Sequence, residues 1–328
     1  VRLALERSHC ARQAVDLLGE LIERHGQSSP PGNGHPAGGD NGFLIADGAE
    51  AFAVETVGHH WVYQEIKEVR AVSNVCLIRQ DWDRISQGLA SYAIGKGWWP
   101  ADGCKLDFAS AFSDFPIGQA SGLRRWGRAT LLLEQQNGHI DGPFLRRVLS
   151  DHYEGTHFEV DPNGQSAGPV PLCQHGNGLR ISGTAFSTIM QISGNDSRLP
   201  IAWCAFGPPC VNIYFPLLVE GELPQACILG DLPIRMVGLL QKFRNDSEGK
   251  ERVRDSLGRL QARFDQEADE FATEGASLKR RDRQFELQRL AGNFMQQTLE
   301  QFDGVLDEFD HSVRNHENEY QAELVSYF

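Results

Sequence analysis

The sequence predicts an α+β protein, and three observations point to that class. Short runs of apolar and β-branched residues, punctuated by Asp-Gly and Gly, occupy residues 43–75 and 183–219, which is typical of antiparallel strands joined by tight turns. Helical patterns separate these two strand-rich blocks. Residues 240–325 contain no proline and repeat apolar side chains at helical spacing. Two sheets flanked by helices are therefore expected.

The first strand-rich block is expected to be a four-stranded meander. Its turn signals include Asp47-Gly48, and its last strand ends at the polar pair Ser73-Asn74. A polar side chain at a strand end either caps structure or faces a site. The strands of the meander are expected over 43–47, 51–56, 61–66 and 69–75.

The remaining elements follow from hydrophobic periodicity and from Gly and Pro punctuation. Helices are expected over 8–25, 79–95, 123–135 and 144–152, with the end of a further helix at 1–7. Strands are expected over 183–192, 201–205 and 210–219, an irregular loop over 108–115, and Gly/Pro-rich loops over 26–42 and 161–171.

The last part of the chain is expected to form two or three amphipathic helices with a break near Gly275. Phenylalanine recurs along it at positions 264, 271, 285, 294, 302 and 309. Such a stripe docks on the body of the protein or on a partner chain, and a homo-oligomer through this tail is one outcome. The predicted division is an αββα domain over 1–230 and a helical extension over 231–328.

Composition narrows the class of protein. The chain has 328 residues and a net charge of −13, and its one basic cluster, 279–283, reads as a solvated helix face. A nucleic-acid partner is therefore not expected. No run reaches the roughly 18 apolar residues of a membrane span. The seven cysteines form no CxxC pair, which favours free thiols in a reducing compartment and a cytoplasmic location.

The residues by themselves indicate little chemistry. The histidines considered as metal ligands are His59, His60, His152, His157 and His175. His59 and His60 would point to opposite faces of a strand, and His152 and His157 are five residues apart, so they share a helix face poorly. On this spacing neither a metal site nor a cofactor is expected. The cysteines are interpreted as small buried apolar residues, and no GxSxG, P-loop or GxGxxG motif occurs.

Several segments, in order, resemble the secernins and the dipeptidase A-type enzymes. Residues 40–61 carry the most specific of them, DNGFLIADGAEAFAVETVGHHW. The others are LIERHGQ at 21–27, AVSNV at 71–75, GKGWW at 95–99, VPLCQH and SGTAFS within 170–187, and WCAFGPPCVNIYFPL at 203–217. The likeness covers about residues 1–219.

The resemblance implies an N-terminal nucleophile (Ntn) hydrolase, an αββα sandwich of two antiparallel sheets. In that family an N-terminal cysteine attacks an amide carbonyl, and its own α-amine acts as the base. The resemblance implies hydrolysis of a small peptide or acyl-amide, by a cysteine-type dipeptidase or acylase. It begins inside the family's pattern, so the nucleophile is expected to be absent from these residues and the sandwich incomplete at the N-terminus. Cys10 is not a substitute, and the chain alone is expected to be inactive.

One polar position carries over from the family. Asn74 matches the amide that stabilises the oxyanion in related hydrolases, and the alternative for it is a strand-end hydrogen bond to a neighbouring loop. The resemblance also implies that His59, Thr184 and Ser187 line the substrate-binding cleft. The alternative to an enzyme is a non-catalytic secernin-like scaffold or binding protein.

Overall fold

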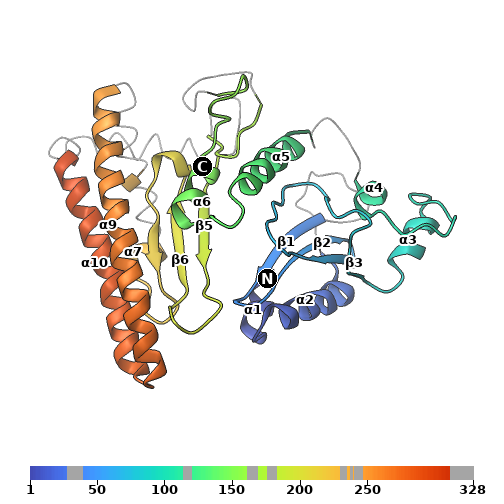
Figure 1. Cartoon of the computed structure of the whole chain (residues 1–328), viewed down its shortest axis with the longest axis horizontal. Helices are drawn as coiled ribbons and strands as arrows, with labels where there is room; N and C mark the ends of the chain where they lie inside the picture. Colours follow the sequence, from blue (N-terminus) through green and yellow to red (C-terminus); the bar gives the residue numbers. More distant parts are fainter. Residues whose placement is uncertain are drawn as a thin grey trace. The chain divides into compact units, whose positions relative to one another are not determined.

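The computed structural model describes residues 1–27, 40–113, 120–160, 169–175, 183–229, 235–236, 239 and 247–310. The chain forms two compact units (Figure 1). Unit 1 comprises residues 1–141, 153–160 and 166–172, and unit 2 comprises 142–152, 161–165 and 173–328. The boundary expected at residue 230 falls inside unit 2. Among the described residues, no helix is both long and apolar enough to cross a membrane.

The sheet of unit 1 is an antiparallel meander, as the sequence predicts. Its order is β1 (Asp40–Ala46), β2 (Ala51–Val57), β3 (His60–Glu65) and β4 (Arg84–Ile85). The Asp47 carboxylate closes the first turn by accepting hydrogen bonds from the Ala49 and Glu50 amides, at 2.7 and 3.0 Å. Gly58 closes the second turn with φ +56°, which a glycine adopts without strain.

The fourth strand of the meander is not the predicted one. Residues 69–75 form only an isolated bridge between Ser73 and Val75, and Arg84–Ile85 takes the edge position instead. The next residues explain the difference, because Ile78 is buried against one face of the sheet. The Glu55 carboxylate on β2 accepts hydrogen bonds from the amides of Leu77 and Ile78. The segment therefore crosses the sheet instead of extending its edge.

Helices cover both faces of this sheet. On one face lies α2 (Ala11–His25), which begins after Cys10 and ends at Gly26, the predicted stop. On the other lie α3 (Leu89–Gly95) and α4 (Phe108–Phe112), so the helix predicted over 79–95 starts later than expected. The loop predicted over 108–115 contains α4 because the Asp107 carboxylate caps it, accepting from the Ser110 amide at 2.9 Å. The other helices of unit 1 are α1 (Arg2–Arg7) and α5 (Ala120–Gln135).

Unit 2 contains the second sheet, also antiparallel, in the order β5 (Phe186–Gln191), β6 (Ile201–Phe206), β7 (Phe215–Leu217). The strand predicted over 210–219 is shorter than expected because Pro209–Val211 forms a 3-10 turn, η2. Gly207 has φ +107°, and a proline lacks the amide that a ladder requires, so the chain turns before β7 begins. The shorter helices of unit 2 include α6 (Gly142–Leu149) and α7 (Gln225–Leu229).

The tail forms two long antiparallel helices, α9 (Ser247–Arg280) and α10 (Gln284–Asp310), packed on the second sheet (Figure 1). The predicted break near Gly275 lies instead at residues 281–283. Gly275 stays helical, and a Cβ there would lie 2.4 Å from the Leu199 side chain, so the glycine permits a close approach.

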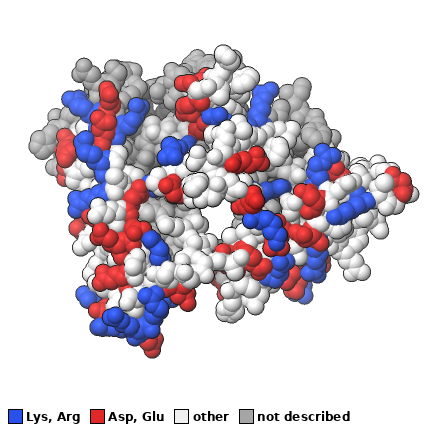
Figure 2. All heavy atoms as spheres, viewed as in Figure 1, with Lys and Arg blue, Asp and Glu red and all other residues white. Residues whose placement is uncertain are grey.

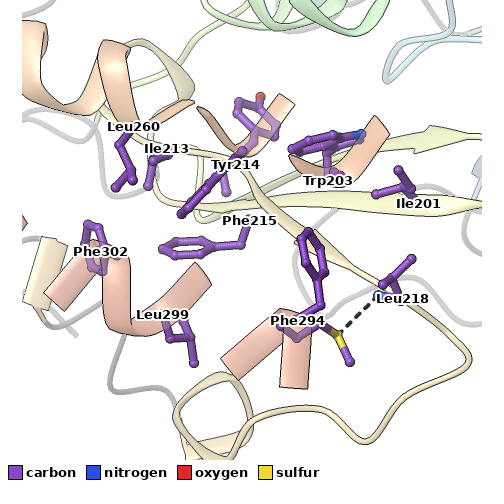
Figure 3. Close-up of a cluster of buried hydrophobic side chains, with 14 of the residues drawn as sticks. Ile201, Trp203, Ile213, Tyr214, Phe215, Leu218, Leu260, Phe294, Leu299 and Phe302 are labelled. Carbon is purple, nitrogen blue, oxygen red and sulfur yellow. Dashed lines mark hydrogen bonds between the residues drawn. The ribbon is translucent and has the colours of Figure 1, made fainter. Parts of the chain in front are cut away.

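The phenylalanine stripe supplies much of the core between helices and sheet. Phe215 on β7 meets Phe302 edge-to-face with ring centroids 5.2 Å apart (Figure 3). The ring of Phe264 lies 6.0 Å from that of Phe215. Leu218 joins the cluster through its amide, which donates to the Met295 sulfur at 3.2 Å. Phe285 departs from the pattern, since 84% of it is exposed. The stripe is thus largely satisfied inside the chain, and the predicted homo-oligomer through the tail stays a prediction.

Charges on the outer surface of α9 and α10 are of both signs (Figure 2). The basic cluster at 279–283 lies at the turn between the two helices and takes part in ion pairs. Lys279 pairs with Glu220 at 3.3 Å and Arg283 with Glu286 at 2.6 Å. Both basic side chains stay more than half exposed, at 56% and 57%, and the interpretation of the cluster as a solvated helix face stays a prediction.

Candidate functional site

Asn74 lies in unit 1, in the segment between β3 and β4, and its side chain is held by an arginine. Its Oδ1 accepts a hydrogen bond of 2.7 Å from Nη2 of Arg125 on α5. Because a guanidinium only donates, the oxygen of the amide must face Arg125 and the NH₂ group must face away from it. Among the described residues, none accepts a hydrogen bond from this NH₂ group. Asn74 is exposed, so its two N–H donors are available to a ligand.

The backbone that presents Asn74 is fixed from two sides. Gly122 of α5 packs so closely that a Cβ there would lie 3.0 Å from Val75 and 3.8 Å from the Asn74 backbone. From the sheet, Glu55 holds the amides just beyond this segment at 2.8–3.0 Å. Burial raises the pKa of Glu55 above its ordinary value, and it lowers the pKa of Arg125.

His59, a predicted cleft residue, also belongs to unit 1 but has a structural contact. Its Nδ1 lies 3.1 Å from the Glu23 carbonyl oxygen near the end of α2. A Cβ on Gly26 would lie 2.8 Å from the ring, so the imidazole packs directly on the turn that ends the helix. His59 thus secures the end of α2, and its assignment to a substrate cleft stays a prediction.

Thr184 and Ser187, the other two predicted cleft residues, belong to unit 2. Ser187 is buried, and its hydroxyl lies 2.7 Å from the Tyr214 hydroxyl. Thr184 braces the segment around Gln174: its amide donates to the Gln174 carbonyl at 2.8 Å, and its hydroxyl accepts from the Gln174 amide at 3.1 Å. Gln174 stands between a cysteine and a histidine that form a separate cluster.

That cluster consists of His152, Cys173, His175 and Cys210, whose ligand-type atoms all lie within 4.8 Å of one another. His175 is at its centre. Its Nε2 lies 3.1 Å from Nε2 of His152, 3.5 Å from Sγ of Cys173 and 3.1 Å from Sγ of Cys210. Cys173 and His152 are buried, with 0% and 4% of their surface exposed. Two thiols and two imidazoles therefore converge on one small volume inside unit 2.

Three separate pieces of backbone bring these side chains together. His152 follows the end of α6, Cys210 sits in the middle of η2, and Cys173 and His175 share one short segment outside the helices and strands. The Cys173 amide donates to the Asp151 carbonyl at 3.1 Å, which ties the segment of Cys173 and His175 to the residues that follow α6. The Gly207 amide donates to the Ala185 carbonyl at 2.8 Å, which continues the pairing of β6 with β5 up to the turn that leads into η2.

The two thiols of the cluster have opposite protonation preferences. A hydrogen bond from Cys210, supported by His152 and His175, lowers the pKa of Cys173 to about 3 against the effect of burial. The same hydrogen bond, together with burial, raises the pKa of Cys210. The sulfur of Cys173 is thus the hydrogen-bond acceptor of the pair and Cys210 the donor, as expected of two thiols that share one site.

Sequence spacing did not reveal this cluster. It paired His152 with His157, but His157 is exposed and is not one of the four residues. The four ligand-type residues span positions 152–210 and meet only in the folded chain. The one local signal was the Cys-x-His triplet at 173–175, which places two such side chains on one short segment.

A second group that could hold a cation is already satisfied. Cys10, Asp47 and Glu50 of unit 1 lie close together. The Asp47 carboxylate accepts three backbone hydrogen bonds, from the amides of Ala11, Ala49 and Glu50, and these lower its pKa. The Glu50 carboxylate pairs with Arg12 at 3.2 Å. These contacts account for the grouping without an ion.

Comparisons with known proteins add no identification. No family model matches the chain. No solved structure gives a significant match to it.

Proposed function

We propose that this chain is part of an amide hydrolase of the secernin-like dipeptidase type, in which Asn74 stabilises the oxyanion. The observation that supports the proposal is the hydrogen bond from Arg125 to the Asn74 oxygen, which turns the NH₂ group outward. When a nucleophile attacks an amide carbonyl, negative charge develops on the carbonyl oxygen. A fixed N–H donor at that oxygen lowers the barrier, because the donor needs no reorganisation during the reaction.

The substrate class follows from the resemblance: a dipeptide or an acyl-amide. In the resembling family a cysteine at the mature N-terminus attacks the carbonyl, an acyl-enzyme forms, and water releases the acid. None of the seven cysteines of the chain matches that nucleophile. The proposal therefore assigns to these residues the positioning of the substrate and the stabilisation of the oxyanion.

We propose further that the protein has the αββα sandwich of that family. In support of it, the sheet β5-β6-β7 is covered by α9 and α10 on one face and exposes large apolar side chains elsewhere. Phe186 and Met190, two positions of β5 with the same orientation relative to the sheet, are 52% and 54% exposed. In a sandwich a second sheet covers such a face.

The test is hydrolysis of a dipeptide panel by the product of the complete reading frame that encodes this chain. Asn74→Ala is expected to lower kcat by about 10²–10³ with an unchanged melting temperature. Asn137→Ala is the matched control, because Asn137 is an exposed asparagine of the same unit that hydrogen-bonds Glu68. Unchanged turnover in Asn74→Ala would remove Asn74 from the mechanism. A product that hydrolyses no member of the panel would favour the alternative, a non-catalytic scaffold.

Arg125 is expected to act as a positioning residue. Arg125→Met frees the Asn74 amide to rotate, so kcat is expected to fall by roughly 10-fold or more while KM changes little. Arg125→Lys keeps a donor for the amide oxygen and is expected to restore part of the rate. Equal losses in both variants, with a lowered melting temperature, would show that Arg125 serves only the fold.

A further inference from the structure

We propose that His152, Cys173, His175 and Cys210 bind one Zn²⁺ ion in a closed tetrahedral site that stabilises unit 2. This site is independent of the proposed hydrolase function, because none of its ligands takes part in that chemistry.

The Nε2 nitrogen of His175 has more close polar neighbours than hydrogen bonding explains. This one nitrogen lies within 3.1–3.5 Å of a second imidazole nitrogen and of two sulfurs. An imidazole nitrogen carries either one proton or one lone pair in the ring plane, so it makes one good hydrogen bond and not three. Hydrogen bonding alone therefore does not account for the convergence, whereas four ligands around a central cation do.

The separations between the ligand atoms are close to those around a tetrahedral zinc ion. A tetrahedral zinc ion binds nitrogen at about 2.0–2.1 Å and sulfur at about 2.3 Å. The edges of that tetrahedron are then about 3.3 Å between nitrogens and about 3.5 Å between nitrogen and sulfur, by simple geometry from those bond lengths. The observed separations are 3.1 Å between nitrogens and 3.1 and 3.5 Å from nitrogen to sulfur. The three separations from Nε2 of His175 are thus within about 0.4 Å of those in a zinc tetrahedron, and all four ligand atoms lie within 4.8 Å of one another.

The donor set selects the metal and its role. Two sulfurs with two imidazoles suit zinc better than calcium or magnesium, which take oxygen ligands. All four positions come from the protein and Cys173 is fully buried, so no coordination position is left for water or a substrate. A closed site of this kind is structural. Two thiolates and two neutral imidazoles also cancel the charge of Zn²⁺, which makes its burial feasible.

The placement of the ligands indicates what the ion would stabilise. His152 is the last residue of the first segment of unit 2, and Cys173 is the first residue of its last segment. Zinc would therefore link the ends of these two segments to η2 through Cys210. The residue after His152, Tyr153, has φ +66°, a left-handed conformation that a non-glycine residue holds only when its surroundings enforce it. The Thr156 amide and hydroxyl, which donate to the Tyr153 carbonyl at 3.1 and 2.7 Å, supply part of that constraint, and a metal bound to the preceding side chain would add to it.

The experiment measures metal in the full chain, purified under reducing conditions without added zinc. We expect one zinc per chain. After removal of zinc, Co²⁺ is expected to give the visible bands of a tetrahedral site and the near-ultraviolet band of thiolate-to-cobalt charge transfer. Cys173→Ser and Cys210→Ser are each expected to lose more affinity than the about 10–100-fold that loss of an outer contact costs. Thr184→Val, which removes the brace on Gln174, is expected to lower affinity by about 10-fold without changing stoichiometry.

Cys227→Ser and His157→Ala are the matched controls, because both residues lie outside the cluster, and both variants are expected to keep the metal. If a ligand variant does not fold, the cobalt spectrum of the wild-type chain still decides the question. Three results would overturn the proposal: no zinc together with no cobalt spectrum in the reduced chain, metal retained in both cysteine variants, or a disulfide between Cys173 and Cys210 in protein kept free of oxygen.

Discussion

Glu55 provides the most direct test of how unit 1 holds the segment that carries Asn74. The side chain is 3% exposed, and its carboxylate accepts hydrogen bonds from the amides of Leu77 and Ile78 at 2.8–3.0 Å. Glu55→Ala leaves both amides without this acceptor. Each buried N–H left unsatisfied costs about 1–3 kcal/mol. Because Leu77 is only half-buried, we expect a total loss of about 2–4 kcal/mol in the free energy of unfolding.

The assay is denaturant unfolding combined with hydrogen exchange at the Leu77 and Ile78 amides, which reports the local opening directly. Glu20→Ala is the control, because Glu20 is an exposed acidic residue on α2 of the same unit. Glu55→Gln retains one carbonyl oxygen as an acceptor and is expected to lose about half as much as Glu55→Ala. If Glu55→Ala lies within about 0.5 kcal/mol of the wild type, like an ordinary surface substitution, the anchoring role is wrong.

The same carboxylate predicts a pH dependence. Desolvation raises the pKa of Glu55 in the folded chain above the ordinary value of 4.5. The folded state therefore binds the proton more tightly than the unfolded state, and the contribution of Glu55 to stability falls as pH rises from 4.5 through the folded pKa. Relative to Glu55→Gln, the wild type is expected to lose stability over that interval and to stay constant above it. A difference that grows in favour of the wild type with rising pH would contradict the burial of this charge.

Two further predictions concern the core of unit 2. Phe302→Ala removes a fully buried ring and is expected to cost about 3–5 kcal/mol in unfolding free energy, whereas Phe285→Ala, at an 84% exposed position of the same helix, is expected to change it little. Gly275→Ala is expected to destabilise by about 1–2 kcal/mol, because overpacking against Leu199 outweighs the gain in helix propensity. Gly258→Ala, on the same helix in open space, is expected to stabilise by up to about 1 kcal/mol; equal effects at the two glycines would refute the packing argument.

Local patterns in the sequence predicted the elements whose stability is local. The 3.6-residue period of the tail and the Asp-Gly and Gly turns of the meander correspond to helices and hairpins in the structure. Failures occurred where a distant partner decides the conformation. Residues 69–75 have strand composition, yet the Glu55 carboxylate holds the chain just beyond them across the face of the sheet. The sequence predicts a loop at Phe108, whereas the Asp107 carboxylate caps a short helix there.

The candidate sites also depend on partners that are distant in the sequence. Asn74 was found through its resemblance to a family motif, but the arginine that orients it is 51 residues away, and no local pattern pairs the two. The zinc ligands were missed for a related reason. Spacing arguments compare neighbours in sequence, whereas the partners of Cys173 come from the end of α6 and from η2. A ligand set assembled by tertiary contacts becomes visible only when the fold brings the segments together.

Because the two proposed centres lie in different units, their effects on stability are separable. Removal of zinc is expected to increase hydrogen exchange in β5, β6 and η2 while the Leu77 and Ile78 amides stay protected. Glu55→Ala is expected to increase hydrogen exchange at the Leu77 and Ile78 amides while β5, β6 and η2 stay protected. If chelation exposed both sets of amides together, the chain would unfold as one cooperative unit, and a loss of hydrolysis in a zinc-ligand variant would then report stability rather than chemistry. The exchange experiment therefore has to precede any kinetic interpretation of the cysteine variants.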